Sequence, residues 1–156
     1  MKLRVISIGT KMPRWVQEGV AEYSKRLGPD LGFSLVELPM TKRSKTQTVQ
    51  QCIDKEGEAI LASLTPADYV VSLEVLGKAL DTQGLAKRLQ HFSHLGRNIS
   101  LIIGGPDGLS SACAKRADES WSLSALTLPH PLVRVLLTEQ LYRAVSLNNG
   151  HPYHRA

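Results

Sequence analysis

The segment ISLIIGGPDG, residues 99–108, carries the clearest fold signal in the chain. Its first half, Ile99–Ile103, is the most continuously apolar of several short β-rich runs, as expected of a central strand buried on both faces of a parallel sheet. Its second half holds three glycines in five residues, Gly104, Gly105 and Gly108, which let the backbone turn sharply. The segment therefore predicts a buried strand that ends in a tight turn before a helix.

Short β-rich runs and longer helical patterns alternate outward from this segment. The other strands are expected at residues 3–8, 33–38, 69–75 (ended by Gly77) and 123–128. Apolar residues at helical spacing predict helices at residues 13–27, 49–64, 85–92 and 131–147, with a short helix beginning at Ser110 or Ser111. This alternation predicts an α/β fold with a mostly parallel sheet flanked by helices. Ligands of such sheets bind beyond the carboxyl ends of the strands, so the strand exits are the segments in which to seek a site.

Length, composition and charge limit the classes of protein to which the chain can belong. The 156 residues predict a single domain, residues 1–156, and 42% hydrophobic with 21% charged residues argues against disorder. The net charge of +5 permits a polyanionic partner such as nucleic acid without requiring one. No apolar run approaches the ~18 residues that span a bilayer, and no secretory signal is recognisable, so we expect a cytoplasmic protein with no membrane partner. Cys52 and Cys113 are expected to be buried thiols.

Two strand exits carry candidate functional residues. The glycine-rich turn at residues 104–108 is consistent with a simple tight turn or with close backbone approach to a ligand, and it matches neither a P-loop nor a dinucleotide fingerprint. His130 stands between Pro129 and Pro131, which favours equally a rigid turn and an anion site at a helix N-terminus. Arg134 has no acidic residue three or four positions away, so we predict that it contacts RNA or a cofactor.

Other features have ordinary explanations or indicate a partner. Two apolar stripes on the helix at 131–147 indicate that it is either fully buried or packed on a second copy, and we favour a homodimer.

Arg143 is expected to pair with Glu139, four residues earlier. Residues 42–45 form the densest basic run, which is expected to be a solvated loop or a phosphate contact. The tail at 151–155 has two histidines without an acidic or cysteine partner, so no metal site is predicted.

Four motifs in fixed order resemble one family. They are LEVLGK at residues 73–78, IGGPDGL at 103–109, SLSALTLPH at 122–130 and YHR at 153–155. Together, over essentially the whole chain, they closely resemble the ribosomal RNA large subunit methyltransferase H family of SPOUT-class methyltransferases. The resemblance implies an α/β fold with a C-terminal trefoil knot, a homodimer, and S-adenosyl-L-methionine as the cofactor. It further implies methylation of N3 of a pseudouridine in the 23S ribosomal RNA of the assembled ribosome.

The resemblance also implies which residues form the site. The expected cofactor-binding residues follow three strand exits and are Leu73, Gly104, Gly105, Leu123, Ser124, Ala125, Leu126, Thr127 and Leu128. Their apolar side chains would enclose the adenine ring, and the two glycines would admit the ligand without a Cβ clash. The expected catalytic residues, which would help the N3 proton to leave, are His130, Arg134, His154 and Arg155. The other chain of the dimer could supply the tail.

Two other functions remain open. A SPOUT methyltransferase acting on another RNA, such as transfer RNA, would share the cofactor site and differ in its RNA-facing residues. A non-catalytic ribosome-binding module would bind no cofactor tightly, and the intact glycine turn argues against it.

Overall fold

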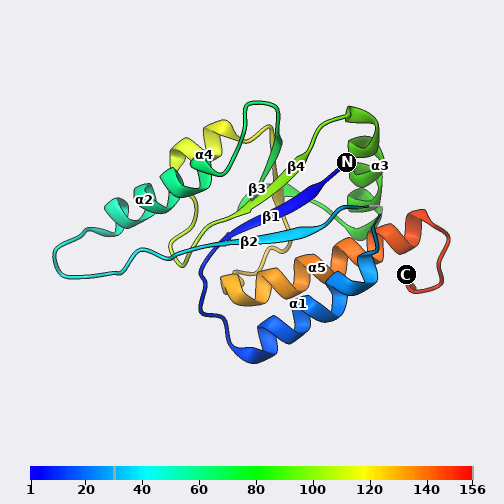
Figure 1. Cartoon of the computed structure of the whole chain (residues 1–156), viewed down its shortest axis with the longest axis horizontal. Coiled ribbons are helices and arrows are strands. Elements are labelled where there is room, and N and C mark those ends of the chain that lie inside the picture. Colours follow the sequence, from blue (N-terminus) through cyan, green and yellow to red (C-terminus); the bar gives the residue numbers. More distant parts are fainter. Residues whose placement is uncertain (30, 156) are drawn as a thin grey trace.

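The computed structural model describes residues 1–29 and 31–155; Asp30 and Ala156, the last residue of the predicted domain, lie outside it. Within the described residues, one sheet contains the strands β1 (Leu3–Ile8), β2 (Ser34–Leu38), β3 (Tyr69–Ala79), β4 (Ile99–Ile103) and β5 (Glu119–Ser122). All neighbouring strands are parallel, in the order β2-β1-β4-β3-β5. This arrangement, shown in Figure 1, confirms the expected α/β fold with a parallel sheet.

The central position of β4 follows from its sequence. All of its residues are buried, and it pairs with β1 on one side and with β3 on the other. Successive side chains of a strand point to opposite faces of the sheet, so an uninterrupted apolar run contributes core on both faces. Leu101 packs in the core on one face, and Ile102 packs in the core on the other.

Helices cover both faces of the sheet. One face carries α1 (Arg14–Leu27), α3 (Thr82–Leu95) and α5 (His130–Asn148), and the other carries α2 (Val49–Ala62) and α4 (Ser111–Arg116) (Figure 1). The larger core lies under α1, α3 and α5 and includes Phe92, Trp121 and Leu137. The smaller core lies under α2 and α4 and includes Ile60 and Cys113, and both cysteines are buried and free, as expected. None of the helices within residues 1–29 and 31–155 has the apolar stretch that spanning a bilayer requires.

Local sequence signals fix the helix ends. Ser110 caps α4, since its hydroxyl accepts a hydrogen bond from the amide of Cys113 at 3.2 Å, as predicted. Thr48 and Gln51 form a capping box at the start of α2. Gly96 ends α3 in the left-handed conformation, with φ at 65°.

The prediction of a strand at residues 123–128 is wrong. The fifth strand is β5, which ends at Ser122, and an irregular segment leads from it to α5. Ser124 explains the difference, because its hydroxyl accepts a hydrogen bond from the amide of Leu126 at 2.9 Å. Its carbonyl accepts another from Ser122 Oγ at 3.0 Å. Such local bonds compete with a strand ladder, and Leu126 is left 72% exposed.

Gly77 lies within β3 and does not end it, contrary to the prediction. The pairing of β3 with β5 shifts register there, since both Leu73 and Lys78 pair with Trp121. The intervening residues bulge out of the ladder, and Leu76 is 98% exposed. A Cβ at Gly77 would lie 2.7 Å from the backbone carbonyl carbon of Trp121, so only glycine allows the two strands to approach so closely.

The apolar stripes of α5 are largely covered within the chain, although Leu132 in its first turn is 37% exposed. Leu137, Leu141 and Ala144 are buried in the larger core, and α5 packs against both α1 and α3. Val135, on the second stripe, lies against Gly19 of α1, where a Cβ would come within 3.1 Å of the valine side chain. The stripes alone therefore do not require a second copy, and the homodimer stays a prediction.

Candidate functional site

A cavity of about 820 Å³ opens at the carboxyl ends of β3, β4 and β5. Its wall consists of residues 73–76 of β3, just beyond the part of β3 that pairs with β4, most of the glycine turn with its neighbours, most of the segment from Trp121 to His130, and Val133 of α5. Ligands of parallel sheets bind at this edge, and sites for small molecules have volumes of about 300–1,000 Å³. The cavity is therefore the candidate site.

Most of the predicted binding residues meet in this one cavity. Those that line it are Leu73, Gly104, Gly105, Leu123, Ser124, Leu126, Thr127, Leu128 and His130. Ala125 lies in the same segment but outside the lining. Arg134, His154 and Arg155 also lie outside the lining in a single chain. The predicted cofactor-binding set and His130 are thus brought together, whereas the other predicted catalytic residues are not.

The glycines of the turn are required by the protein's own packing. A Cβ on Gly104 would lie 2.5 Å from the backbone carbonyl carbon of Gly108, which itself has φ of 87°. A Cβ on Gly105 would lie 3.0 Å from Glu56 Oε1 and 3.2 Å from Ile8 Cγ2. The expectation that these glycines also admit the ligand stays a prediction. They let the turn fold upon itself and against α2, and the cavity wall depends on that fold.

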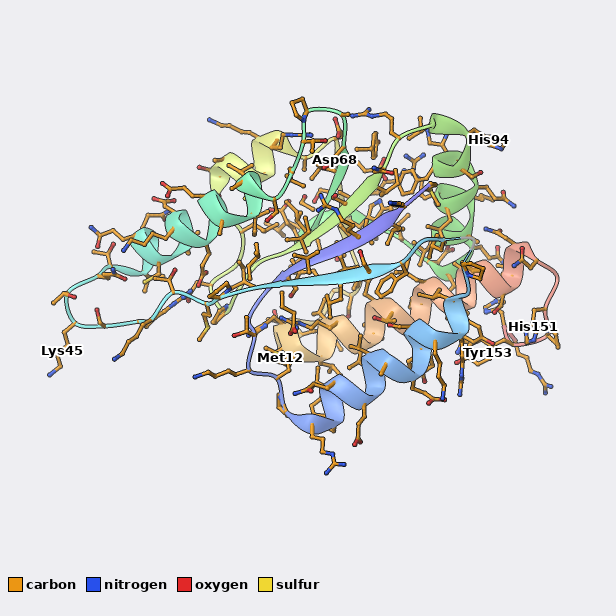
Figure 2. All side chains as sticks on the ribbon, viewed as in Figure 1. Met12, Lys45, Asp68, His94, His151 and Tyr153 are labelled. Atoms are coloured by element: carbon orange, nitrogen blue, oxygen red, sulfur yellow. The ribbon has the colours of Figure 1, made fainter. Side chains whose placement is uncertain are left out.

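Arg43 holds the glycine turn from outside the cavity. Its guanidinium donates to both oxygens of Glu56, a buried carboxylate on α2, and to Asp107 Oδ2 at 2.9 Å. The amide of Thr41 donates a further hydrogen bond to Glu56 at 3.0 Å. Arg43 is thus engaged in ion pairs, whereas Lys45 of the same basic run stands at the tip of the loop between β2 and α2 and points away from the body (Figure 2).

Arg134, which we expect to contact RNA or a cofactor, has an acidic partner in the structure. Arg134 is 2% exposed and forms an ion pair with Glu37 of β2 at 2.5 Å. Its Nη2 donates to the carbonyls of Ile8 at 3.2 Å and Gly9 at 2.6 Å, at the end of β1. Glu37 is 97 residues away in the sequence, so helical spacing could not identify it. Arg134 therefore fixes the first turn of α5, which carries His130, to the exits of β1 and β2.

His130 presents a neutral imidazole to the cavity. Burial lowers its pKa below the ordinary 6.5, and the positive charge of Arg134 lowers it further, although Glu56 acts in the opposite direction. Its Nδ1 is buried without a hydrogen-bond partner among residues 1–29 and 31–155. The ring packs against the loop after β1, where a Cβ on Gly9 would lie 3.3 Å from its Cε1. An imidazole that is uncharged near neutral pH can accept a proton.

Glu74 lines the cavity, although it is not among the site residues predicted from the sequence. Its Oε2 accepts hydrogen bonds from Ser72 Oγ at 2.8 Å and from Ser120 Oγ at 2.9 Å. The signal that could have identified it is its position directly after Leu73 in the motif LEVLGK, just beyond the part of β3 that pairs with β4. The other lining residues that the sequence did not single out are mainly apolar and include Val75, Leu76, Ile103, Trp121 and Val133.

The tail folds back along α5 and away from the cavity of its own chain. Tyr153 donates a hydrogen bond to Glu139 Oε1 at 3.1 Å, and its ring lies 4.5 Å from that of Tyr142. Arg143 lies over the Tyr153 ring and pairs with Glu139, as predicted. Figure 2 shows His151 and Tyr153 near the end of α5, whereas the cavity lies at its first turn.

His154 and Arg155, the predicted catalytic residues of the tail, follow Tyr153. Both ring nitrogens of His154 are buried without a partner among the described residues, and Arg155 is exposed. A site that uses these side chains would need the tail of a second chain. In the part of the chain that the structure describes, no group of three His, Cys, Asp or Glu residues could hold a metal ion.

Comparisons with known proteins cover almost the whole chain. A family profile described as "Predicted SPOUT methyltransferase" matches residues 1–154. The protein named ribosomal RNA large subunit methyltransferase H from Marinomonas sp. (strain MWYL1) is 51% identical over 155 residues, which cover 99% of this chain and 100% of that protein.

Two solved structures are similar at low sequence identity. A probable methylase family protein from Haemophilus influenzae Rd KW20 has a TM-score of 0.58 and 12% identity, covering 99% of this chain and 70% of that one. A probable methyltransferase from Bordetella pertussis Tohama I has a TM-score of 0.60 and 16% identity, covering 92% and 93%. At these identities the two structures show a shared fold alone.

Proposed function

Because the chain belongs to the SPOUT methyltransferase family, we propose that it methylates N3 of a pseudouridine in the 23S ribosomal RNA of the assembled ribosome, with S-adenosyl-L-methionine as the methyl donor. The substrate is supported by the relative at 51% identity, which is named a ribosomal RNA large subunit methyltransferase. The net charge of +5 is compatible with such a polyanion. We propose further that the whole chain is one domain acting in the cytoplasm, with the trefoil knot of its family in the C-terminal segment.

The observation that carries the proposal is the cavity built on the glycine turn. Apolar side chains in its wall, among them Leu73, Leu123 and Leu128, suit the faces of an adenine ring. Backbone groups of the strand exits can bond to the edge of the ring, and the carboxylate of Glu74 suits a cationic ligand. The residues present therefore fit S-adenosyl-L-methionine, which when bound supplies a methyl group on a sulfonium.

The side chains near the cavity have separate roles in this proposal. The cavity wall orients the methyl donor toward the RNA base, and such alignment is the main contribution to rate. N3 of pseudouridine carries a proton that must leave, and we assign its acceptance to the imidazole of His130, whose pKa is lowered. Arg134 is a positioning residue, because it contacts the exits of β1 and β2 and not the cavity. His154 and Arg155 of a second chain would stabilise the deprotonated ring.

A homodimer is part of the proposal. Trp15, in the first turn of α1, is 56% exposed, and Leu132, in the first turn of α5, is also exposed. Gly19 and Val135 are in contact one turn further along the same two helices, so Trp15 and Leu132 lie on neighbouring turns of one surface. A second copy packed there would cover both side chains and supply the tail that a single chain keeps away from its cavity.

Transfer of a labelled methyl group tests the proposed function. The purified protein is incubated with labelled S-adenosyl-L-methionine and with assembled ribosomes, isolated large subunits or bulk transfer RNA, and the labelled nucleoside is identified by mass spectrometry. We expect label on a ribosomal pseudouridine, most strongly with assembled ribosomes. Label on transfer RNA would show that the substrate is a different RNA, and the proposed cofactor would stand. Absence of label together with absence of cofactor binding would favour a non-catalytic ribosome-binding module.

A further inference from the structure

Glu74 places a carboxylate in a wall that is otherwise largely apolar. It lies where β3 leaves its register with β5, and the apolar residues Leu73, Val75 and Trp121 line the same cavity. A charged group in such a position loses hydration, and this cost is compensated only by a partner of opposite charge or by hydrogen bonds.

Two hydroxyls hold this carboxylate in one orientation. Ser72 on β3 and Ser120 on β5 both donate to Oε2 of Glu74, at 2.8 and 2.9 Å. The side chain is therefore tied to two adjacent strands through a single oxygen. The other oxygen, Oε1, accepts no hydrogen bond from the described part of the chain and is available to a ligand.

The neighbouring carboxylates at this edge of the sheet have cationic partners, whereas Glu74 has none. Glu37 pairs with Arg134, and Glu56 pairs with Arg43. Within residues 1–29 and 31–155, Glu74 forms no ion pair. A carboxylate that has no cationic partner and lies beside apolar walls attracts a cation more strongly than one surrounded by water.

We propose that Glu74 binds the positive charge of S-adenosyl-L-methionine and makes the cavity prefer this ligand to S-adenosyl-L-homocysteine, the product. This inference rests on the proposed cofactor. The two ligands differ by one methyl group and by the charge on sulfur. In the transfer, the methyl carbon–sulfur bond breaks with its electron pair left on sulfur, the carbon–N3 bond forms, and the N3 proton passes to His130. The sulfur is then neutral, so the attraction to Glu74 is lost and the product leaves more readily.

Calorimetric binding of both ligands to the wild type and to Glu74→Gln tests this proposal. Glutamine keeps the shape and the hydrogen bonding of the side chain and removes its charge. We expect Glu74→Gln to bind S-adenosyl-L-methionine about tenfold more weakly, the factor of one charge-assisted contact. Binding of S-adenosyl-L-homocysteine should change by less than about twofold. Glu58→Gln, which removes an exposed carboxylate on α2, is the matched control and should change neither affinity.

The possible results separate this inference from the cofactor proposal. Equal weakening of both ligands in Glu74→Gln, or no weakening of either, would overturn the role of Glu74 alone. Failure of both ligands to bind the wild type would overturn the proposed cofactor and this inference with it. If Glu74→Gln shows no cooperative thermal unfolding, Glu74→Asp provides the second comparison, because it retains the charge. It should keep the preference for the sulfonium ligand, and loss of that preference would contradict the proposal.

Discussion

At Gly104, the shape of the cavity depends on the absence of one carbon atom. A Cβ there would lie 2.5 Å from the carbonyl carbon of Gly108 and 2.7 Å from the amide nitrogen of Leu109. Both contacts are with backbone, which cannot rotate aside as a side chain can. At Gly105 the closest contact is with the side chain of Glu56, at 3.0 Å, and that side chain can shift. The two neighbouring glycines should therefore differ in their tolerance of substitution.

Gly104→Val is expected to weaken binding of S-adenosyl-L-methionine by roughly 100-fold or more, and Gly105→Ala by less than about tenfold. Calorimetry measures both affinities. Overpacking costs roughly 1–3 kcal/mol of stability, so each variant is first tested for cooperative unfolding. If a folded Gly104→Val protein bound the ligand as the wild type does, the glycine turn would not form the cofactor site.

His130 leads to a prediction about pH and stability. Burial and Arg134 lower the pKa of this imidazole in the folded protein, so the unfolded chain binds a proton there more readily. The free energy of unfolding should therefore fall as the pH decreases below about 6.5, until the lowered pKa is passed. His130→Gln removes this contribution, so urea denaturation should show a smaller loss of stability between about pH 7.5 and pH 5. Equal losses in both proteins would contradict the lowered pKa.

At the scale of elements, two arginines join the exits of separate strands. Arg134 links α5 to β1 and β2, and Arg43 links the loop after β2 to α2 and to the glycine turn. Each arginine thereby holds in place a segment that borders the cavity. Arg43 and Arg134 are thus engaged in ion pairs at the edge of the sheet where the cavity lies.

Arg134→Met is expected to lower the free energy of unfolding by about 3 kcal/mol, because it leaves buried carbonyls and Glu37 without their donor. The matched control is Arg14→Met, which removes an exposed pair with Glu18 on α1 and should cost less than about 1 kcal/mol. Urea denaturation measures both. Similar losses in the two variants would show that the buried guanidinium of Arg134 contributes no more to stability than an exposed one.

Local periodicity predicts those strands and helices whose apolar pattern lies entirely within the element itself. The apolar run of β4 and the helical spacing in α1 and α3 correspond closely to the observed elements. Residues 123–128 contain leucines at spacings that resemble a strand, yet the hydroxyl of Ser124 holds them in an irregular form. The sequence suggests that Gly77 ends a strand. In the structure, glycine is needed there because β3 comes close to the backbone of Trp121, which is distant in sequence. Elements set by such contacts could not be predicted from their own residues.

At the scale of the whole molecule, the parallel sheet brings every strand exit to one edge. That edge could be predicted from the alternation of strands and helices, and the resemblance to the family supplied about half of the residues that line the cavity. The strand order could not be predicted from local patterns, and it is the order that puts β4, β3 and β5 side by side. Glu74 and the partner of Arg134 were missed for the same reason, since both depend on contacts between neighbouring strands and helices.

Arg155→Ala tests whether the tail acts in a second chain. The substitution should leave the affinity for S-adenosyl-L-methionine within about twofold, because Arg155 lies outside the cavity of its own chain. Single-turnover methylation of ribosomes should fall by about tenfold or more. Lys115→Ala, on the exposed surface of α4, is the control and should change neither quantity. Unchanged single-turnover methylation in Arg155→Ala would show that the tail takes no part in the active site.

A crystal structure of the protein grown with S-adenosyl-L-methionine tests most directly the central claim, that the cavity at the ends of β3, β4 and β5 is the cofactor site. We predict ligand density between Leu73 and the glycine turn, with the positive sulfur on the side of Glu74. Density at another place, or an empty cavity at a concentration that saturates binding in calorimetry, would contradict the claim.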